Sequence, residues 1–273
     1  MNLLQDYYHI NENKNEFIYK NKCYQLICID DLKEFERLYS IYLYYMNLSH
    51  IMPYTIVYNK YHQIHSCNHI LFTYEQQKIN IHHYLYAFIR PLPQSIYIKD
   101  IKEQWIHKSN ELRKHLNKNI QTSAFIYYYT GLIEYCITLL NHILYHNPRC
   151  FIPVSLSLKH CLDNSTQLIN PTSYIISSRV RHLVLLLKSQ IIEVDDLVPL
   201  LNHNILTQEE LYYFIACILY PHDINLNTII TLSYTKHIEN INKVIKIYKK
   251  VYKVLNNKFS IVKISWLNEE NML

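Results

Sequence analysis

The chain contains one glycine, Gly131, in 273 residues, where average usage near 7% would give about 19. Glycine allows the backbone to approach an anion closely, so a chain without glycine elsewhere cannot form a glycine-rich phosphate-binding loop. Gly131 lies in "YYYTGLIEYC", whose apolar spacing predicts a helix. A glycine inside a helix costs roughly 1 kcal/mol relative to alanine. We therefore expect a close contact near Gly131 that requires the missing side chain.

Composition limits the functional class. A hydrophobic content of 49% is enough for the core of one large or two modest domains. The surplus of Tyr, Ile, Asn and Lys is typical of AT-rich codon usage, which accounts for part of the glycine deficit. The net charge is only +5 and the basic residues are scattered apart from one C-terminal cluster, so a nucleic-acid-binding protein is not expected.

The same sequence carries no targeting or membrane signal that we recognise. Its longest apolar runs, such as residues 183–187, are far shorter than the roughly 20 residues that span a bilayer, and no signal peptide opens the chain. Seven cysteines, without a CxxC pair, favour reduced thiols. We therefore expect a cytoplasmic protein without a transmembrane segment.

Two hydrophobic patterns divide the chain. Alternation predicts strands at 16–19, 23–29, 54–58 and 69–75, with a further strand near 84–88. Asp30 or Asp31 is placed to cap a helix that extends to residue 48. From about residue 100 the spacing is helical at 101–116, 123–146, 180–190, 194–202, 207–220 and 236–255, with an irregular segment at 148–179. We predict an α+β fold with a small antiparallel β-rich lobe (1–78) and a larger, mainly helical lobe (79–273).

This layout resembles the two-lobed protein-kinase-like fold, and several motifs carry a closer resemblance. "YYYTGLIEYCITLL" at 127–140 resembles the helix "YYxGLAENAIxYL" of spore-coat kinase-like proteins of the CotS and YutH type, which are relatives of the aminoglycoside and choline phosphotransferases. Residues 154–161 fall where that family has its catalytic-loop strand and histidine. Residues 169–189 are similar to "PxxWVYDHxxRDLAEWIR", and 206–224 to "LSxxxWRLLYARLLFPLHYF". The resemblance spans most of the chain.

The resemblance implies a catalytic loop that has lost its acid. Phosphoryl transfer on this fold uses a glycine-rich cover, a lysine paired with a helix glutamate, a catalytic-loop aspartate and a second aspartate for magnesium. The loop of the relatives reads His-x-Asp, whereas here His160 is followed by Cys161 and by Leu162. A shifted loop would recruit Asp163 and Asn164. The other interpretation is a turn held by the local hydrogen bonds that Asp and Asn favour.

The other catalytic positions are also changed. The metal-binding aspartate falls on Ser177, and the aspartate of "RDL" falls on His182. Arg181 is retained, either in a salt bridge or backbone contact at its helix start or as an exposed residue. The strand at 23–29 has Gln25 and no lysine, so Glu34 or Glu36 has no cation to position. Lysine codons are AT-rich, so AT-rich codon usage does not explain the missing lysine. We expect neither an intact catalytic site nor a cofactor.

The resemblance also assigns structural roles to two residues of the helix at 123–146. It places Gly131 on a core helix, where the missing side chain would admit another helix or the catalytic-loop strand. Glu134, one turn later, is expected to cap or pair inside the same lobe.

Two further patterns have alternative interpretations. His62, His65, His69 and Cys67 are candidate zinc ligands, but scattered surface histidines are the interpretation we favour, and no metal is expected. The last helix places its lysines, such as Lys243 and Lys249, mostly opposite an apolar stripe. Such a helix either docks through its apolar face or lies on an acidic lipid or partner.

Together these expectations describe a catalytically degenerate kinase-like protein. By resemblance it would act in endospore formation, in the mother-cell cytoplasm and on the spore coat, as an assembly or interaction module with other coat proteins as partners. The alternative is a residual ATP-dependent phosphotransferase that uses Asp163, Asn164 and His160 on a small-molecule or protein hydroxyl. A helical structural protein unrelated to kinases is a third class, which an antiparallel sheet with one packed helix in the first hundred residues would exclude.

Overall fold

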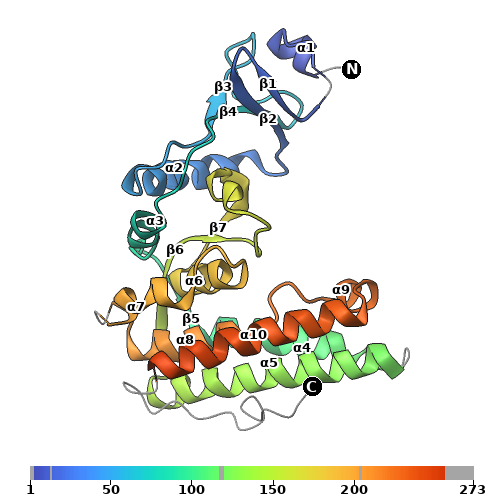
Figure 1. Ribbon diagram of the computed structural model, residues 1–273, viewed down its shortest axis with the longest axis vertical. Coiled ribbons are helices and arrows are strands. Elements are labelled where there is room, and N and C mark those ends of the chain that lie inside the picture. Colours follow the sequence, from blue (N-terminus) through green and yellow to red (C-terminus); the bar gives the residue numbers. More distant parts are fainter. Residues whose placement is uncertain (1–2, 13, 117–119, 203–204, 256–273) are drawn as a thin grey trace. The chain divides into compact units, whose positions relative to one another are not determined.

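The structure, a computed structural model, describes residues 3–12, 14–116, 120–202 and 205–255 (Figure 1). The chain is α+β, as expected, with many helices and two small sheets. It forms two compact units. The first unit comprises Met1–Arg90, Leu156–Lys159 and Asp163–Ile176, and the second comprises Pro91–Ser155, His160–Leu162 and Ser177–Leu273. The lobe division after residue 78 stays a prediction.

A four-stranded antiparallel sheet forms the first unit's scaffold, in the order β1-β2-β4-β3. Its strands are β1 (Glu16–Tyr19), β2 (Lys22–Cys28), β3 (Thr55–Val57) and β4 (His69–Tyr74). They confirm the four strands expected between residues 16 and 75. The tight turn between β1 and β2 holds Lys20 and Asn21, both with positive φ. Because this sheet lies in the first hundred residues, an all-helical chain is excluded.

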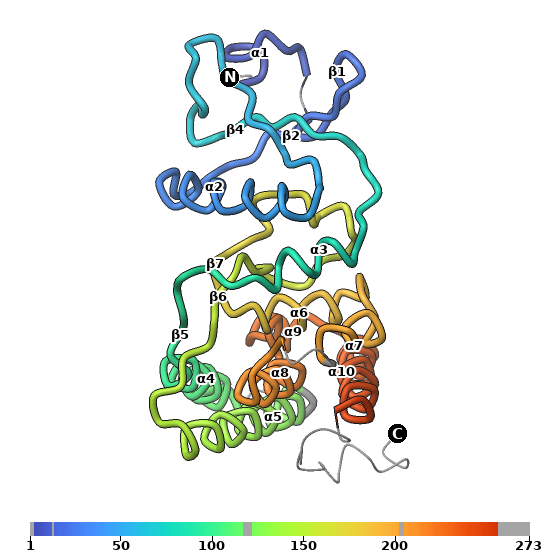
Figure 2. Tube along the Cα trace, turned by 90° about the vertical axis from the view of Figure 1, so that its left-hand side faces the viewer, coloured from blue at the N-terminus to red at the C-terminus, as the bar shows by residue number. Residues whose placement is uncertain are grey.

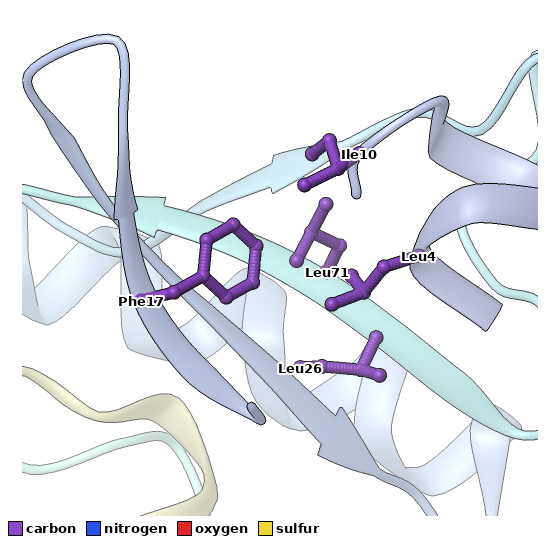
Figure 3. Packing of buried hydrophobic residues seen from close by; sticks show 5 residues of the cluster. All are labelled: Leu4, Ile10, Phe17, Leu26 and Leu71. Atoms are coloured by element: carbon purple, nitrogen blue, oxygen red, sulfur yellow. The ribbon is translucent and has the colours of Figure 1, made fainter. Parts of the chain in front are cut away.

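Each face of this sheet is covered by apolar side chains. A cluster of Phe17, Leu26 and Leu71 from the strands packs with Leu4 of α1 (Leu3–Tyr8) and with Ile10 (Figure 3). Successive residues of a strand point to opposite faces, so the neighbour of Leu71, Phe72, serves the other face. There Phe72 packs against Phe35 of α2 (Leu32–Leu48), with ring centroids 5.9 Å apart. Asp31 caps α2 by accepting the Glu34 N–H at 3.1 Å, which confirms the expected cap.

The segment 163–176 joins the first unit through a buried tyrosine. The Tyr42 hydroxyl donates to the Ile169 carbonyl at 2.6 Å and accepts the Tyr54 N–H at 2.8 Å. Tyr42 is almost fully buried, and burial raises the pKa of its phenol well above the usual value. The segment carries two 3-10 helices, Ser165–Ile169 and Pro171–Ser173, and leads into β7 (Tyr174–Ser178).

The strand expected near 84–88 is wrong. These residues belong to the helix α3 (Ile81–Phe88), whose cap, Asn80, accepts the His83 N–H at 3.2 Å. Tyr84, Leu85 and Phe88 are buried with helical spacing. Five mostly apolar residues fit a strand and a helix equally, and the cap four residues upstream of Tyr84 decides between them.

Helices dominate the second unit, and they confirm the expected helical segments. Figures 1 and 2 show α4, α5, α8 and α10 running alongside one another, and α8 packs against α5, α6 and α10. The helices are α4 (Ile98–Arg113), α5 (Ile120–His146), α6 (Arg179–Lys188), α7 (Val194–Asn202), α8 (Gln208–Leu219), α9 (Leu226–Thr231) and α10 (Tyr234–Leu255). A short strand, β5 (Ser95–Tyr97), pairs antiparallel with β6 (Phe151–Leu158). The sequence patterns predicted neither β5 nor the short helices α1 and α9.

The last helix, α10, docks through its apolar face. Tyr248, Val251 and Leu255 are buried, and α10 contacts α6, α7 and α8. Lys246 and Lys249 remain exposed. The docking interpretation of this basic helix is therefore confirmed. None of the helices in the described part of the chain has the length and apolarity that crossing a membrane requires.

The close contact expected at Gly131 is wrong. Gly131 is exposed near the middle of α5, and a Cβ added there would meet nothing within 4 Å. The left-handed backbone conformation, which favours glycine, is instead adopted by other residue types. Among the described residues these are His9, Lys20, Asn21, His50, His62, Cys67, Asn68 and Gln190.

Gln190 shows how such a position arises. It follows α6 with φ 59, its N–H donates to the Leu187 carbonyl at 3.0 Å, and the next N–H, of Ile191, donates to Leu186 at 3.1 Å. This is the Schellman termination, whose left-handed residue is usually glycine. An L-residue with a Cβ costs roughly 1 kcal/mol or more in this conformation.

Replacing Gly131 by alanine and introducing glycine at position 190 should each stabilise the protein. We expect Gly131→Ala and Gln190→Gly each to raise the free energy of unfolding by about 0.5–1 kcal/mol, measured by urea denaturation. Ala124 is also exposed on α5, so Ala124→Gly is the matched control and should lower stability by a similar amount. A destabilised Gly131→Ala variant would show that the space beside Gly131 is needed after all.

Candidate functional site

The loop at 160–162 belongs to the second unit and holds an apolar residue where the relatives have an aspartate. Leu162 is buried, with 5% of its surface exposed, and its N–H donates to Ser189 Oγ at 2.8 Å. Ser189 Oγ in turn donates to the Leu185 carbonyl at 2.7 Å. His160, two residues earlier, is exposed. The loop is thus fixed to the end of α6 by a buried leucine and a backbone hydrogen bond.

The two polar residues that follow make a turn. Asn164 caps the 3-10 helix Ser165–Ile169, its Oδ1 accepting the Gln167 N–H at 3.3 Å and the Thr166 hydroxyl at 2.5 Å. The N–H of Asp163 donates to Gln167 Oε1 at 3.0 Å, and its carboxylate side chain is exposed. The turn interpretation of "LDNST" is confirmed. Asn164 Oδ1 already accepts two hydrogen bonds within that turn.

Ser177, which the sequence resemblance aligned with a metal-binding aspartate, carries no charge. Ser177 is half-buried at the end of β7, and the next residue, Ser178, caps α6 by accepting the Arg181 N–H at 3.1 Å. Arg181 is half-buried and is therefore not the exposed arginine of the other interpretation, and the role expected of its side chain stays a prediction. His182 is fully buried, and burial, with a smaller effect from Arg181, lowers its pKa to about 3. His182 is therefore neutral near pH 7.

Glu34, expected to lack a cation, makes a local contact on its own helix. Glu34 binds Arg37 on the same exposed face of α2 at 2.7 Å, and this hydrogen bond lowers the pKa of the Glu34 carboxyl. Glu36 is exposed. In β2, Gln25 is half-buried, and its Oε1 has no hydrogen-bond partner among the residues that the structure describes.

No metal centre is assembled in the described ranges, where no three His, Cys, Asp or Glu side chains gather closely enough to hold an ion. Of the candidate zinc ligands, His69 Nδ1 lies 2.8 Å from the Cys67 carbonyl oxygen. Cys67 Sγ lies 3.8 Å from the Tyr7 hydroxyl. The side chains of His69 and Cys67 are thus occupied by local contacts.

A buried ion pair in the second unit went unrecognised in the sequence. Arg179 Nε and Nη2 donate to the two carboxylate oxygens of Glu210, both at 2.7 Å, and Glu210 is fully buried. Glu210 also accepts the Thr207 N–H at 3.0 Å, while Thr207 Oγ1 accepts the Glu210 N–H, which forms a capping box at the start of α8. The spacing T-x-x-E before an apolar run is the sequence signal of this box. Nothing in that spacing points to Arg179.

Glu134 forms an ion pair with a residue of the same unit, which is one of the two roles expected of it. The pair lies on the surface. The Glu134 carboxylate binds Arg113 of α4, and both side chains are about half exposed. This pair joins α4 to α5, whereas Arg179–Glu210 joins α6 to α8.

The second unit also contains a pocket of about 160 Å³. Side chains from α5, α10, the ends of α6 and α8, the turn after α8 and Cys161 line it. Lys188, at the end of α6, has only 7% of its surface exposed. Its Nζ donates to the carbonyls of Cys217 at 3.1 Å and of Tyr220 at 2.7 Å, so Lys188 caps the carboxyl end of α8.

Burial and neighbouring cations set the protonation states around this pocket. Burial lowers the pKa of Lys188, and it lowers the pKa of Lys108 to about 8. The pKa of His222 is held well below its ordinary value by burial first and then by Lys188, so this imidazole is neutral near pH 7. Burial, reinforced by Asp223, raises the pKa of the Cys161 thiol to about 12. The imidazole of His222 and the thiol of Cys161 are therefore uncharged near pH 7.

Comparison with known proteins finds no matching family model, no similar curated protein and no similar solved structure. The kinase-like identity therefore remains a proposal that depends on the sequence motifs.

Removing the charge of Glu210 should test the buried pair. We expect Glu210→Gln to lower the free energy of unfolding by about 3–5 kcal/mol, because it leaves the Arg179 guanidinium buried beside an uncharged amide. Glu134→Gln is the matched control, since it removes the same charge from an exposed pair, and should cost at most about 1 kcal/mol. Chemical denaturation of both variants measures the difference. Equal losses would mean that the Arg179–Glu210 pair adds no more than a surface pair.

Proposed function

We propose that this chain is a catalytically degenerate kinase-like protein that serves as an assembly or interaction module of the spore coat. The observation that carries the first half of this proposal is the burial of Leu162 at the position of the catalytic aspartate, with its N–H held by Ser189 Oγ. A leucine side chain accepts no proton. Recruiting an acid there would require this loop to leave its packed position.

The remaining positions support the same conclusion. Ser177 has no charge to hold magnesium, and His182 is buried and neutral. Asn164 accepts hydrogen bonds within its own turn. Glu34 is paired with Arg37 on its own helix. Ser177 and His182 are thus uncharged and Asn164 and Glu34 are engaged locally, whereas Asp163, His160 and Glu36 are exposed.

The coat assignment depends on the resemblance of the segments at 127–140, 169–189 and 206–224 to the spore-coat family. The segments at 127–140 and 206–224 include most of α5 and α8, which pack against each other in the second unit. A module retained for its fold requires this core and dispenses with the catalytic groups. The alternative, a residual phosphotransferase, is favoured only by the exposed carboxylate of Asp163.

We expect MgATP to leave the stability of the protein unchanged. A ligand that binds only the native state stabilises it by about 2.7 kcal/mol at a concentration of 100 Kd, so thermal unfolding at a few millimolar MgATP detects even weak binding. Magnesium alone is the control. A rise in Tm together with ATP hydrolysis, both lost in Asp163→Ala, would establish the residual phosphotransferase instead.

The coat assignment is tested in the cell that encodes the chain. A fluorescent fusion should gather at the forming spore during sporulation, and Gly131→Ala, which alters an exposed site on α5, should leave that localisation intact. An encoding organism that forms no endospores, or a fusion that stays diffuse throughout sporulation, would contradict the assignment.

A further inference from the structure

The pocket in the second unit contains the buried amine of Lys188, which lies within reach of the charge of Asp223 but forms no ion pair with any residue that the structure describes. Lys188 Nζ bonds to two carbonyl oxygens, and the ion pairs found in the described part of the chain do not include this residue. A lysine ammonium has three N–H donors, so one donor remains. Burying a charge without an ion-pair partner is costly, and the carbonyl end of α8 offsets only part of that cost.

The surroundings add positive charge and an unpaired polar atom. Lys243 of α10 also lines the pocket, and Lys108 lies behind its wall, donating to the Pro221 carbonyl at 2.7 Å. Asp223 is the carboxylate among the lining residues, and it is exposed. His222 Nε2 is buried and has no hydrogen-bond partner within the described residues. The lining thus has more cationic than anionic groups and a polar atom that a ligand can satisfy.

Most of the rest of the lining is apolar, and the pocket is large enough to hold an aromatic ring. Leu132 of α5, Leu219 of α8 and Val244 of α10 contribute aliphatic surface to the pocket. A cavity of about 150 Å³ lined by such side chains accommodates benzene, and this pocket measures about 160 Å³. Since Asp223 and Asn240 are both exposed and line it, the pocket reaches the protein surface.

We propose that this pocket binds a small organic anion, a carboxylate with a benzene-sized apolar body. The carboxylate is bound by the ammonium groups of Lys188 and Lys243, and the apolar body packs against Leu132 and Val244. Anion binding gives Lys188 an ion-pair partner inside the pocket, which the exposed Asp223 does not provide. This inference depends only on the geometry of the second unit and is independent of the kinase resemblance.

Benzoate is a suitable probe, because its ring and carboxylate match the two parts of the pocket. The full chain is titrated with benzoate, with the uncharged isostere benzamide and with the cation benzylamine, and binding is followed by ligand-observed NMR. We expect saturable benzoate binding that is about tenfold tighter than benzamide binding, with no binding of benzylamine. Benzamide binding as tightly as benzoate, or the absence of saturable benzoate binding, would overturn the proposal.

Two lysines of α10 provide a matched pair of variants. Lys243→Gln removes a half-buried lining charge and should weaken benzoate binding about tenfold without changing benzamide binding. Lys249→Gln removes an exposed charge from the same helix outside the pocket and should leave both affinities unchanged. Equal effects of the two variants on benzoate would reduce the binding to general surface attraction and contradict the proposal. Circular dichroism of both variants checks that they fold.

Discussion

The arrangement of the second unit depends on two buried cations at opposite ends of α6. At the start of α6, Arg179 binds Glu210 at the start of α8, and at its end Lys188 binds the carbonyls at the end of α8. Because the starts of α6 and α8 are joined to each other and their ends are joined to each other, the two helices run in the same direction. Nearly every residue of α8 from Leu211 to Leu219 is buried, and such an apolar helix needs its polar ends satisfied inside the core. Both ends are satisfied by α6.

The same double attachment also orders the residues next to the two ends of α6. Ser178 caps α6 immediately before Arg179, and Ser189 follows Lys188 and holds the N–H of Leu162. Ser177 and Leu162, which the proposed kinase resemblance aligns with a metal ligand and a catalytic acid, therefore adjoin the two ends of the same anchored helix. In an active kinase these positions carry charge toward a ligand. Here the neighbouring charges face inward and stabilise the packing of α6 on α8, and the same Lys188 gives the pocket its positive character.

The sequence predicted much of the fold and less of the site, for identifiable reasons. Strands β1 to β4 and the long helices follow from hydrophobic periodicity, which local burial determines. Helix α3 was mistaken for a strand because its apolar segment is too short to distinguish the two periods. The turn at Asn164 was one of two interpretations of this loop, and the local hydrogen bonds of Asn164 show that it is the one adopted. Arg179–Glu210 joins residues 31 positions apart, and the pocket around Lys188 combines α5, α6, α8 and α10, so no local pattern in the sequence encodes either.

The misreading of Gly131 shows what a strong compositional bias does to sequence reasoning. In an ordinary chain a glycine inside a helix indicates a close approach, because alanine would otherwise be favoured there. In this chain glycine is scarce everywhere, and the one that remains has open space beside it. The left-handed positions that favour glycine are occupied by residues such as His50 and Gln190, each at a cost of roughly 1 kcal/mol. That cost is tolerable only because helix termini and tight turns are fixed by the packing of the elements they connect. The backbone conformation is therefore retained where the residue that best fits it is absent, and the position of glycine in such a chain carries little structural information.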